Sequence, residues 1–202
     1  MVNIFVEGGG KGDNLKTACR KGFREFLNKA GFMGKKFRIW PCGSRGEARN
    51  NYVKALKNGE QAVLLLDSET DVALEQNGDH ANWEPWIHLG WDKPHGAENK
   101  DCHLMVQVME TWFLADIESL KRSCGRNFDA VKLPKHKNIE LIPKAEVFNA
   151  MKIASEGKFD KKANPEFSYI ILSRIDPTLV SSKSPWARRF LDLLKIKMQT
   201  TN

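Results

Sequence analysis

Four acidic residues stand where short apolar segments of the chain end. They are Glu7, after Val2–Val6, Asp67 and Glu69, after Ala62–Leu66, and Glu110, after residues 102–109. Each apolar run has the length and composition of a strand buried in a parallel sheet. Because the chemistry of an open α/β sheet lies outside the carboxyl ends of its strands, we expect these four side chains to converge on one edge.

Clustered carboxylates repel one another unless a cation or a proton lies among them, and their oxygen atoms suit Mg²⁺ or Mn²⁺. The pattern therefore predicts a metal-dependent phosphoryl-transfer site, in which Asp67 and Glu69 hold the ion and Glu110 is a further ligand. Two plainer interpretations stay open. Glu7 would be an ordinary surface residue at a strand end, and Glu110 would pair with a buried arginine and serve the architecture.

The segments between these acids must place them on one sheet. An apolar pattern with helical spacing covers residues 15–30, and a second helix is expected after Ser44, with Glu47 three residues later as in a capping box. A strand at 37–40 separates the two helices. The order strand–helix–strand–helix–strand predicts an α/β fold with a mainly parallel, Rossmannoid sheet flanked by helices.

The rest of the chain divides into an insertion and an extension. Residues 70–101 carry tryptophans and histidines without a clear period, as in a functional loop or lid, and the histidine spacing matches no zinc pattern. Residues 117–202 are expected to form a helical, basic extension packed on an α/β core of residues 1–116. Its last helix would follow Ser184-Pro185, with the serine as its cap.

Charge is distributed unevenly over the 202 residues, which carry a formal net charge of +7. Residues 1–66 hold 13 basic and 5 acidic residues (+8), residues 67–116 hold 2 and 11 (−9), and residues 117–202 hold 17 and 9 (+8). An acidic centre between basic flanks suits a metal site that handles a polyanion such as DNA or RNA. The alternative is that these blocks are solvated faces.

The sequence indicates neither a membrane protein nor an exported one. No run is long and apolar enough to span a bilayer, and Glu7 interrupts the first apolar segment before a signal-peptide core forms. The four cysteines are widely spaced and include no CxxC pair, which favours reduced thiols in the core. We therefore expect a cytoplasmic protein without membrane contact.

Glycines and basic residues near the acids are the candidates for substrate binding. Gly8 and Gly9 would let backbone N–H groups approach a phosphate. The basic candidates are Lys11, Arg20, Arg45, Lys144, Arg174, Arg188 and Arg189. For each of them the alternative is a solvated surface charge.

These motifs together resemble the Toprim domain of topoisomerases, primases, small RNA-maturation nucleases and overcoming-lysogenization-defect nucleases. That resemblance covers residues 1–116 and rests on Val6-Glu7-Gly8-Gly9 and Leu65-Leu66-Asp67-Ser68-Glu69. Over nearly its full length the chain is similar to a bacterial family of unknown function with a Toprim-like core. The segments that carry this wider similarity are Glu110-Thr-Trp-Phe-Leu-Ala-Asp116, Ile142-Pro-Lys144, and Arg174-Ile-Asp-Pro177 with Ser184-Pro-Trp-Ala-Arg188-Arg189-Phe190.

The resemblance implies a Mg²⁺-dependent nuclease with Glu7 as the general acid/base or as a ligand of a second ion. It also implies an ATPase partner in a mobile-element, antiphage defence system. The usual Toprim pair is Asp-x-Asp, and here it is Asp67-Ser68-Glu69, whose longer glutamate shifts the ion or routes it through water. The alternative is therefore a non-catalytic Toprim-like module that binds nucleic acid or docks on an ATPase. A phosphatase or nucleotide-processing enzyme is a third, weaker hypothesis.

Overall fold

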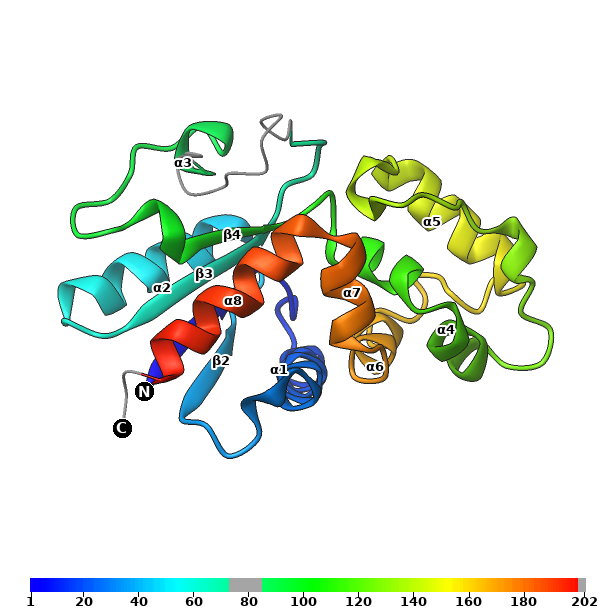
Figure 1. The fold of residues 1–202 in the computed structure, drawn as a ribbon, viewed down its shortest axis with the longest axis horizontal. Coiled ribbons are helices and arrows are strands. Elements are labelled where there is room, and N and C mark those ends of the chain that lie inside the picture. The colour runs from blue at the N-terminus through cyan, green and yellow to red at the C-terminus, as the bar shows by residue number, and fades with distance from the viewer. Residues whose placement is uncertain (73–84, 200–202) are drawn as a thin grey trace.

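The computed structural model describes residues 1–72 and 85–199 and contains a four-stranded, all-parallel sheet in the order β2-β1-β3-β4 (Figure 1). The strands are β1 (Val2–Val6), β2 (Phe37–Pro41), β3 (Ala62–Asp67) and β4 (Cys102–Met105). Ile4 of β1 lies opposite Ile39 on one side and Val63 on the other. The predicted α/β class with a parallel sheet flanked by helices is confirmed.

Helices and helical turns make up most of the remaining described residues. The α-helices are α1 (Asp13–Leu27), α2 (Arg45–Lys57), α3 (Pro85–His88), α4 (Ile117–Cys124), α5 (Lys144–Ala154), α6 (Phe167–Leu172), α7 (Pro177–Lys183) and α8 (Pro185–Gln199). A π-helical turn (Asn28–Phe32) continues α1, and 3₁₀ turns span Asn99–Asp101, Met109–Ala115, Ala130–Lys132 and Ile139–Leu141.

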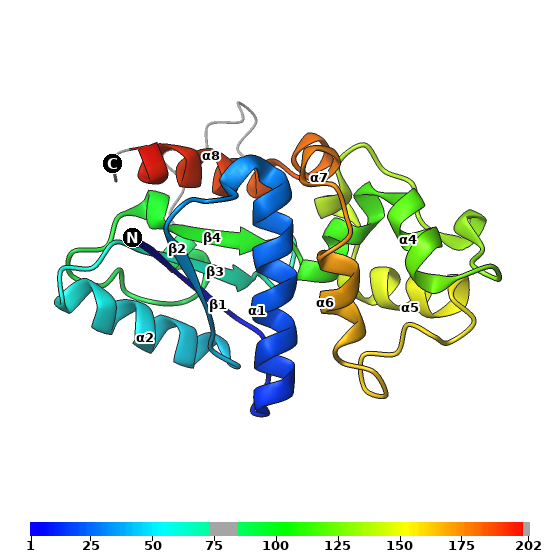
Figure 2. The same ribbon diagram turned by 90° about the horizontal axis from the view of Figure 1, so that it is seen from below.

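The sheet is covered on both faces. On one face α1 and α8 place Phe23 and Phe190 in one core with Ile4 of β1. On the other face α2 and α3 place Tyr52 and Trp86 in a second core with the alternate strand residues (Figure 2). Since successive strand residues point to opposite faces, the strands are apolar throughout, which explains their unbroken runs in the sequence.

The ends of the helices follow local sequence signals. The Ser44 hydroxyl accepts a hydrogen bond from the Glu47 N–H at 3.3 Å, so the predicted cap of α2 is confirmed. Ser184 likewise caps α8 by accepting from the Ala187 N–H at 3.1 Å. The first helix differs from the prediction, because it begins at Asp13 and its end is π-helical, with Gly31 at φ 93°.

The helices α4 to α7 form an extension at the edge toward which the strands point (Figure 2). Its apolar residues share one continuous core with the α1 face of the sheet. The helices α1 and α6 pack closely against each other. There a Cβ atom on Gly22 would lie 2.8 Å from the carbonyl oxygen of Tyr169, so only glycine leaves room for the crossing.

The fourth strand is shorter than predicted. β4 ends at Met105, and Glu110, expected at the end of an apolar strand, lies in the 3₁₀ turn Met109–Ala115. Every residue of that turn is buried. A short apolar run fits a buried strand and a buried helical turn equally well, and for this reason the pattern misplaced Glu110.

The predicted insertion is described only in part, because residues 73–84 lie outside the described residues. Within the described part, Trp86 is buried with its ring centroid 5.8 Å from that of Tyr52, and the Arg49 guanidinium lies over Trp91.

All four cysteines are buried and free, as expected. In the described ranges, no helix has both the length and the apolar character needed to cross a membrane.

Candidate active site

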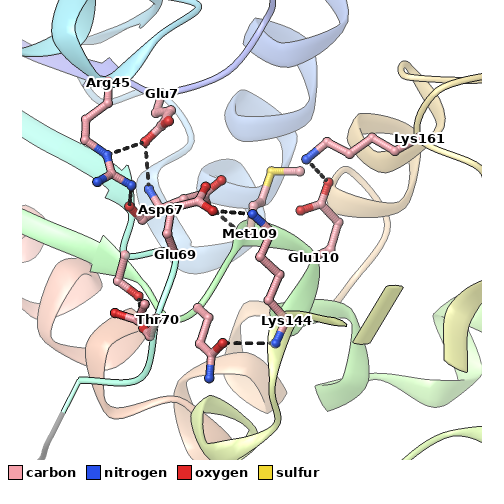
Figure 3. Close-up of polar contacts among 11 residues, drawn as sticks. Glu7, Arg45, Asp67, Glu69, Thr70, Met109, Glu110, Lys144 and Lys161 are labelled. Atoms are coloured by element: carbon pink, nitrogen blue, oxygen red, sulfur yellow. Dashed lines mark hydrogen bonds and ion pairs between the residues drawn. The ribbon is translucent and has the colours of Figure 1, made fainter. Parts of the chain in front are cut away.

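Glu7, Asp67, Glu69 and Glu110 gather where the strands end (Figure 3). Glu7 follows β1, Asp67 is the last residue of β3, and Glu69 comes two residues later. Glu110 reaches the same place from the 3₁₀ turn after β4. In Figure 3, Glu7 with Arg45 lies on one side of Asp67, and Glu110 with Lys161 lies on the other.

Glu7 is fixed against β3 by two contacts. Its Oε2 atom accepts a hydrogen bond from the Asp67 N–H at 3.2 Å and lies 3.5 Å from Nε of Arg45. Arg45, in the first turn of α2, also donates to the Asp67 carbonyl oxygen at 2.8 Å. Burial raises the pKa of Glu7, and the Glu69 carboxylate adds to this, whereas Arg45 and the Asp67 N–H act in the opposite direction.

Asp67 lies between the other acids. Its Oδ1 atom accepts a hydrogen bond from the Met109 N–H at 2.9 Å, which ties β3 to the 3₁₀ turn. Burial, then the Glu110 carboxylate, then the Glu7 carboxylate raise the pKa of Asp67 well above its usual value, and Lys161 partly opposes them. Burial first, and the two neighbouring carboxylates second, therefore favour the protonated form of Asp67 in the protein without a bound cation.

Glu69 is the most exposed of the four acids. Its Oε2 atom forms an ion pair with Nζ of Lys144, the first residue of α5. The backbone of Glu69 is in the left-handed region at φ 67°, and its N–H donates to the Gln107 carbonyl oxygen at 2.8 Å. The Gln107 side chain in turn accepts from the Lys144 N–H at 2.9 Å, so one residue positions both partners.

Glu110 has no exposed side-chain surface. Its Oε1 atom accepts from the Ser168 hydroxyl at 3.0 Å and lies 2.9 Å from Nζ of Lys161. Its buried Oε2 atom has no hydrogen-bond partner among the described residues. Burial lowers the pKa of Lys161, but the carboxylates of Glu110, Asp67 and Glu69 outweigh this and raise it, so the ammonium form is held in place.

The glycine loop after β1 is braced within the protein. The N–H of Gly8 donates to the Gly43 carbonyl at 3.0 Å, and the N–H of Gly9 donates to the Tyr169 hydroxyl at 2.7 Å. Gly8 has φ 130°, and a Cβ atom there would lie 2.7 Å from the Tyr169 oxygen. Glycine at this position is therefore required both by the backbone and by the close approach of α6.

The predicted basic residues separate into two groups. Arg45 and Lys144 contact the acids, as described, while Lys11 and Arg20 are exposed, on the glycine loop and on α1. Arg174 donates to the Ser123 hydroxyl in α4, away from the acids.

The two arginines of α8 also serve the architecture. Arg188 donates to the Ser181 carbonyl at 3.0 Å. Arg189 donates to the carbonyls of Cys102 and Asn99, both at 2.8 Å, at the amino end of β4 and so at the opposite edge of the sheet from the acids.

The residues that sequence reasoning missed come from the extension and from the backbone. Lys161 lies in a segment without periodicity that gives no signal beyond being a loop. Ser168 and Tyr169 belong to a short apolar helix whose partners are more than 50 residues away in the chain. Glu110 forms an ion pair, as one interpretation of the sequence expected. Its partner is the exposed Lys161, whereas that interpretation expected a buried arginine.

The four acids have the chemistry to bind a divalent cation, but their side chains do not form a complete coordination site in this structure. Carboxylate oxygens are the ligands that Mg²⁺ and Mn²⁺ prefer. The buried Oε2 atom of Glu110 has no hydrogen-bond partner among the described residues and could contact a cation. In the part of the chain that is described, however, no three His, Cys, Asp or Glu side chains are close enough to ligate one ion. Lys144 and Lys161 neutralise Glu69 and Glu110 instead.

The fold and the site define an α/β protein with an acidic cluster at the carboxyl edge of a parallel sheet, closed by basic residues of a helical extension. Residues 6–195 match the family described as a domain of unknown function (DUF4276), and because this match spans almost the whole chain, the protein belongs to that family. No curated protein and no solved structure matches it.

Proposed function

We propose that the protein is a nuclease that cleaves the phosphodiester bonds of DNA or RNA with Mg²⁺ or Mn²⁺ at the carboxyl edge of its sheet. The observation that carries the proposal is the convergence of Glu7, Asp67 and Glu110 from three separate segments, with Lys144 and Lys161 beside them. The carboxylates supply the oxygen ligands of a hard cation, and the two lysines supply charge for a phosphate.

Each side chain has a role in this scheme. Asp67 and Glu110 would hold the ion, with Glu69 as a further ligand, directly or through water. The bound ion would stabilise negative charge on the phosphate and activate a water molecule. Glu7 would transfer the proton, which is the role that the Toprim resemblance implies. Lys144 and Lys161 would leave Glu69 and Glu110 for the phosphate oxygens once the cation neutralises those carboxylates.

The wider setting is proposed from the resemblance alone. The resemblance to Toprim-like proteins suggests an ATPase partner and an antiphage defence system in the cytoplasm. These elements of the proposal are independent of the site chemistry, because a metal ion held by these carboxylates would support cleavage with or without a partner that delivers the substrate.

A second candidate function is a non-catalytic module that binds nucleic acid or docks on an ATPase. The observation in its favour is that Glu7, Glu69 and Glu110 each have a cationic partner from the protein itself. In such a module the ion pairs would be permanent, and no divalent ion would enter.

Cleavage assays separate the two functions. Supercoiled plasmid, single-stranded DNA and tRNA would be incubated with purified protein and Mg²⁺ or Mn²⁺, with and without a candidate ATPase. We expect cleavage by the wild type and at least about a 100-fold loss in Glu7→Gln and Asp67→Asn. Asp92→Asn, at an exposed aspartate remote from the acids in the sequence, is the matched control and should cleave normally. Equal cleavage by all variants, or none by the wild type in any condition, would refute the nuclease.

A further inference from the structure

A pocket lies beside Glu110, because Lys161 both lines it and contacts that acid. This pocket, which we call the aromatic pocket, has a volume of about 410 Å³. It is lined by Phe148, Lys152, Phe159, Asp160, Lys161 and Lys162. It is formed by α5 and by the segment that follows this helix. None of these residues except Lys161 has a role in the chemistry proposed above.

One lysine links the aromatic pocket to the acids. Nζ of Lys161 lies 2.9 Å from Oε1 of Glu110 and 5.3 Å from the centre of the Phe148 ring. The ring and the carboxylate are therefore both neighbours of a single ammonium group. Anything stacked on Phe148 would be a close neighbour of a phosphate bound at the acids.

The face of α5 continues this connection outward. Lys144, Phe148 and Lys152 follow one another at intervals of four residues and so share one face of the helix. The first contacts Glu69, and the second and third line the aromatic pocket. A cation, an aromatic ring and a cation thus follow one another along α5, and cations combined with an aromatic ring are the groups that bind the phosphates and bases of a single strand.

One ring of the aromatic pocket is buried in the core, and the other is partly exposed. Phe159 is 3% exposed and packs against Phe113 and Phe167. Phe148 stacks on Phe159 with ring centres 6.3 Å apart, but it is only partly buried. A base that stacks here would meet a platform already fixed by the core, so little side-chain freedom is lost on binding.

The charges of the aromatic pocket favour an anionic ligand. Lys152, Lys161 and Lys162 outnumber the single acid Asp160, whose carboxylate is engaged by Lys152 at 3.3 Å and by the N–H groups of Lys162 and Ala163. Because Lys161 pairs with Glu110 outside the pocket lining, the positive charge beyond these two ion pairs is that of Lys162. An apolar peptide would gain nothing from three lysines. A base with its phosphates would use both the ring and the cations.

We propose that the aromatic pocket holds an unstacked base of single-stranded DNA or RNA, next to the phosphate that is bound at the acids. This inference rests on the proposed nuclease function and specifies its substrate as single-stranded or locally opened nucleic acid. A base inside a regular duplex cannot reach Phe148 without leaving its stack.

Binding measured in EDTA tests this without any cleavage. Fluorescence anisotropy would follow a labelled 20-nucleotide oligo(dT), an abasic oligonucleotide of the same length, and a duplex. We expect Phe148→Ala and Phe148→Leu to weaken oligo(dT) binding about tenfold, which corresponds to about 1.4 kcal/mol. Phe148→Tyr, which keeps the ring, should stay within about twofold of the wild type. Ile153→Ala, at an exposed position of the same helix, is the matched control and should also stay within twofold.

The results that would contradict the base site differ from those that would contradict the nuclease proposal. The proposed base site is wrong if the wild type does not bind oligo(dT), or if Phe148→Leu binds it as well as the wild type. It is also wrong if Phe148→Ala and Phe148→Leu weaken the binding of oligo(dT), the abasic strand and the duplex equally. Asp67→Asn should bind oligo(dT) at least as tightly as the wild type. If that variant also cleaves normally, the nuclease proposal fails while the base site stands. Thermal unfolding of each variant shows that it is folded.

Discussion

Asp67 accepts a hydrogen bond from the Met109 N–H while two further carboxylates, those of Glu110 and Glu7, act on it. Hydrogen bonding favours its charged form, but burial and the neighbouring charges disfavour that form more strongly. A protein without ligands gains no stability from such an arrangement. The repulsion is understandable if a cation belongs among these residues.

Replacing Asp67 by asparagine should therefore stabilise the protein in EDTA. The amide oxygen still accepts from Met109, whereas the repulsion with Glu110 and Glu7 disappears. We expect the free energy of unfolding to rise by about 1 kcal/mol or more, which is about 2–4 °C in melting temperature for a chain of this size. The measurement is thermal unfolding of the metal-free protein.

Glu69→Gln is the comparison for this experiment. Glu69 is 40% exposed on its side chain and paired with Lys144, and exposed pairs contribute little, so its loss should change stability by less than about 1 kcal/mol. A melting temperature of Asp67→Asn at or below that of the wild type would show that Asp67 is not under electrostatic strain.

At the scale of elements, the sequence predicted those parts that local patterns determine. The unbroken apolar runs gave β1 and β3 with the acids at their ends, and Ser44 and Ser184 gave the starts of α2 and α8. These signals depend on neighbours in the chain. The contacts of Glu110 with Ser168 and Lys161 join residues about 50 or more positions apart, and no periodicity encodes such a contact.

The crossing of α1 and α6 gives a test of element packing. Alanine has a higher helix propensity than glycine, but at Gly22 its Cβ atom would lie 2.8 Å from the Tyr169 backbone oxygen. We expect Gly22→Ala to lower the free energy of unfolding by about 1–3 kcal/mol, because α6 must shift. Chemical denaturation of the variant measures this.

Gly46 is the matched control for the crossing. It lies in the first turn of α2, and its Cβ atom would meet nothing within 4 Å. Gly46→Ala should be neutral or stabilising by up to about 1 kcal/mol. If both variants behave alike, steric closeness at α1–α6 does not determine the packing.

A buried glutamate in the 3₁₀ turn Ile139–Leu141, which contacts the start of α8, should make stability depend on pH. Glu140 accepts hydrogen bonds from the Ser184 hydroxyl and the Trp186 N–H, yet burial dominates and raises its pKa to about 7. Since the folded protein holds this proton more tightly than the unfolded chain, the contribution is fully present below about pH 4.5 and is lost as pH rises to about 7.

Glu140→Gln removes that titration while keeping an acceptor oxygen. We expect the variant to gain stability relative to the wild type as the pH is raised from 5 to 8, by up to about 3 kcal/mol. Urea denaturation of both proteins across this pH range is the measurement. A constant difference between them would mean that Glu140 is ionised in the folded protein throughout.

At the scale of the whole molecule, the site is shared between the sheet and the helical extension. The sheet edge and the turn after β4 carry the four acids, while the extension supplies Lys144, Lys161 and Ser168. The acidic block, residues 67–116, contains three of these acids and the basic block 117–202 contains both lysines, whereas Glu7 lies in the first basic block. An acidic centre with cations around it is the arrangement expected for a metal site that binds a polyanion.

The most direct test of this account is a crystal of the protein soaked in Mn²⁺ and measured at the manganese absorption edge. The account predicts an anomalous peak about 2.1 Å from a carboxylate oxygen of Asp67 and from one of Glu110, Glu7 or Glu69, with Lys161 or Lys144 displaced from its acid, and no peak in Asp67→Asn. A fully soaked crystal without a peak among these four acids, with their ion pairs to Arg45, Lys144 and Lys161 intact, would contradict it.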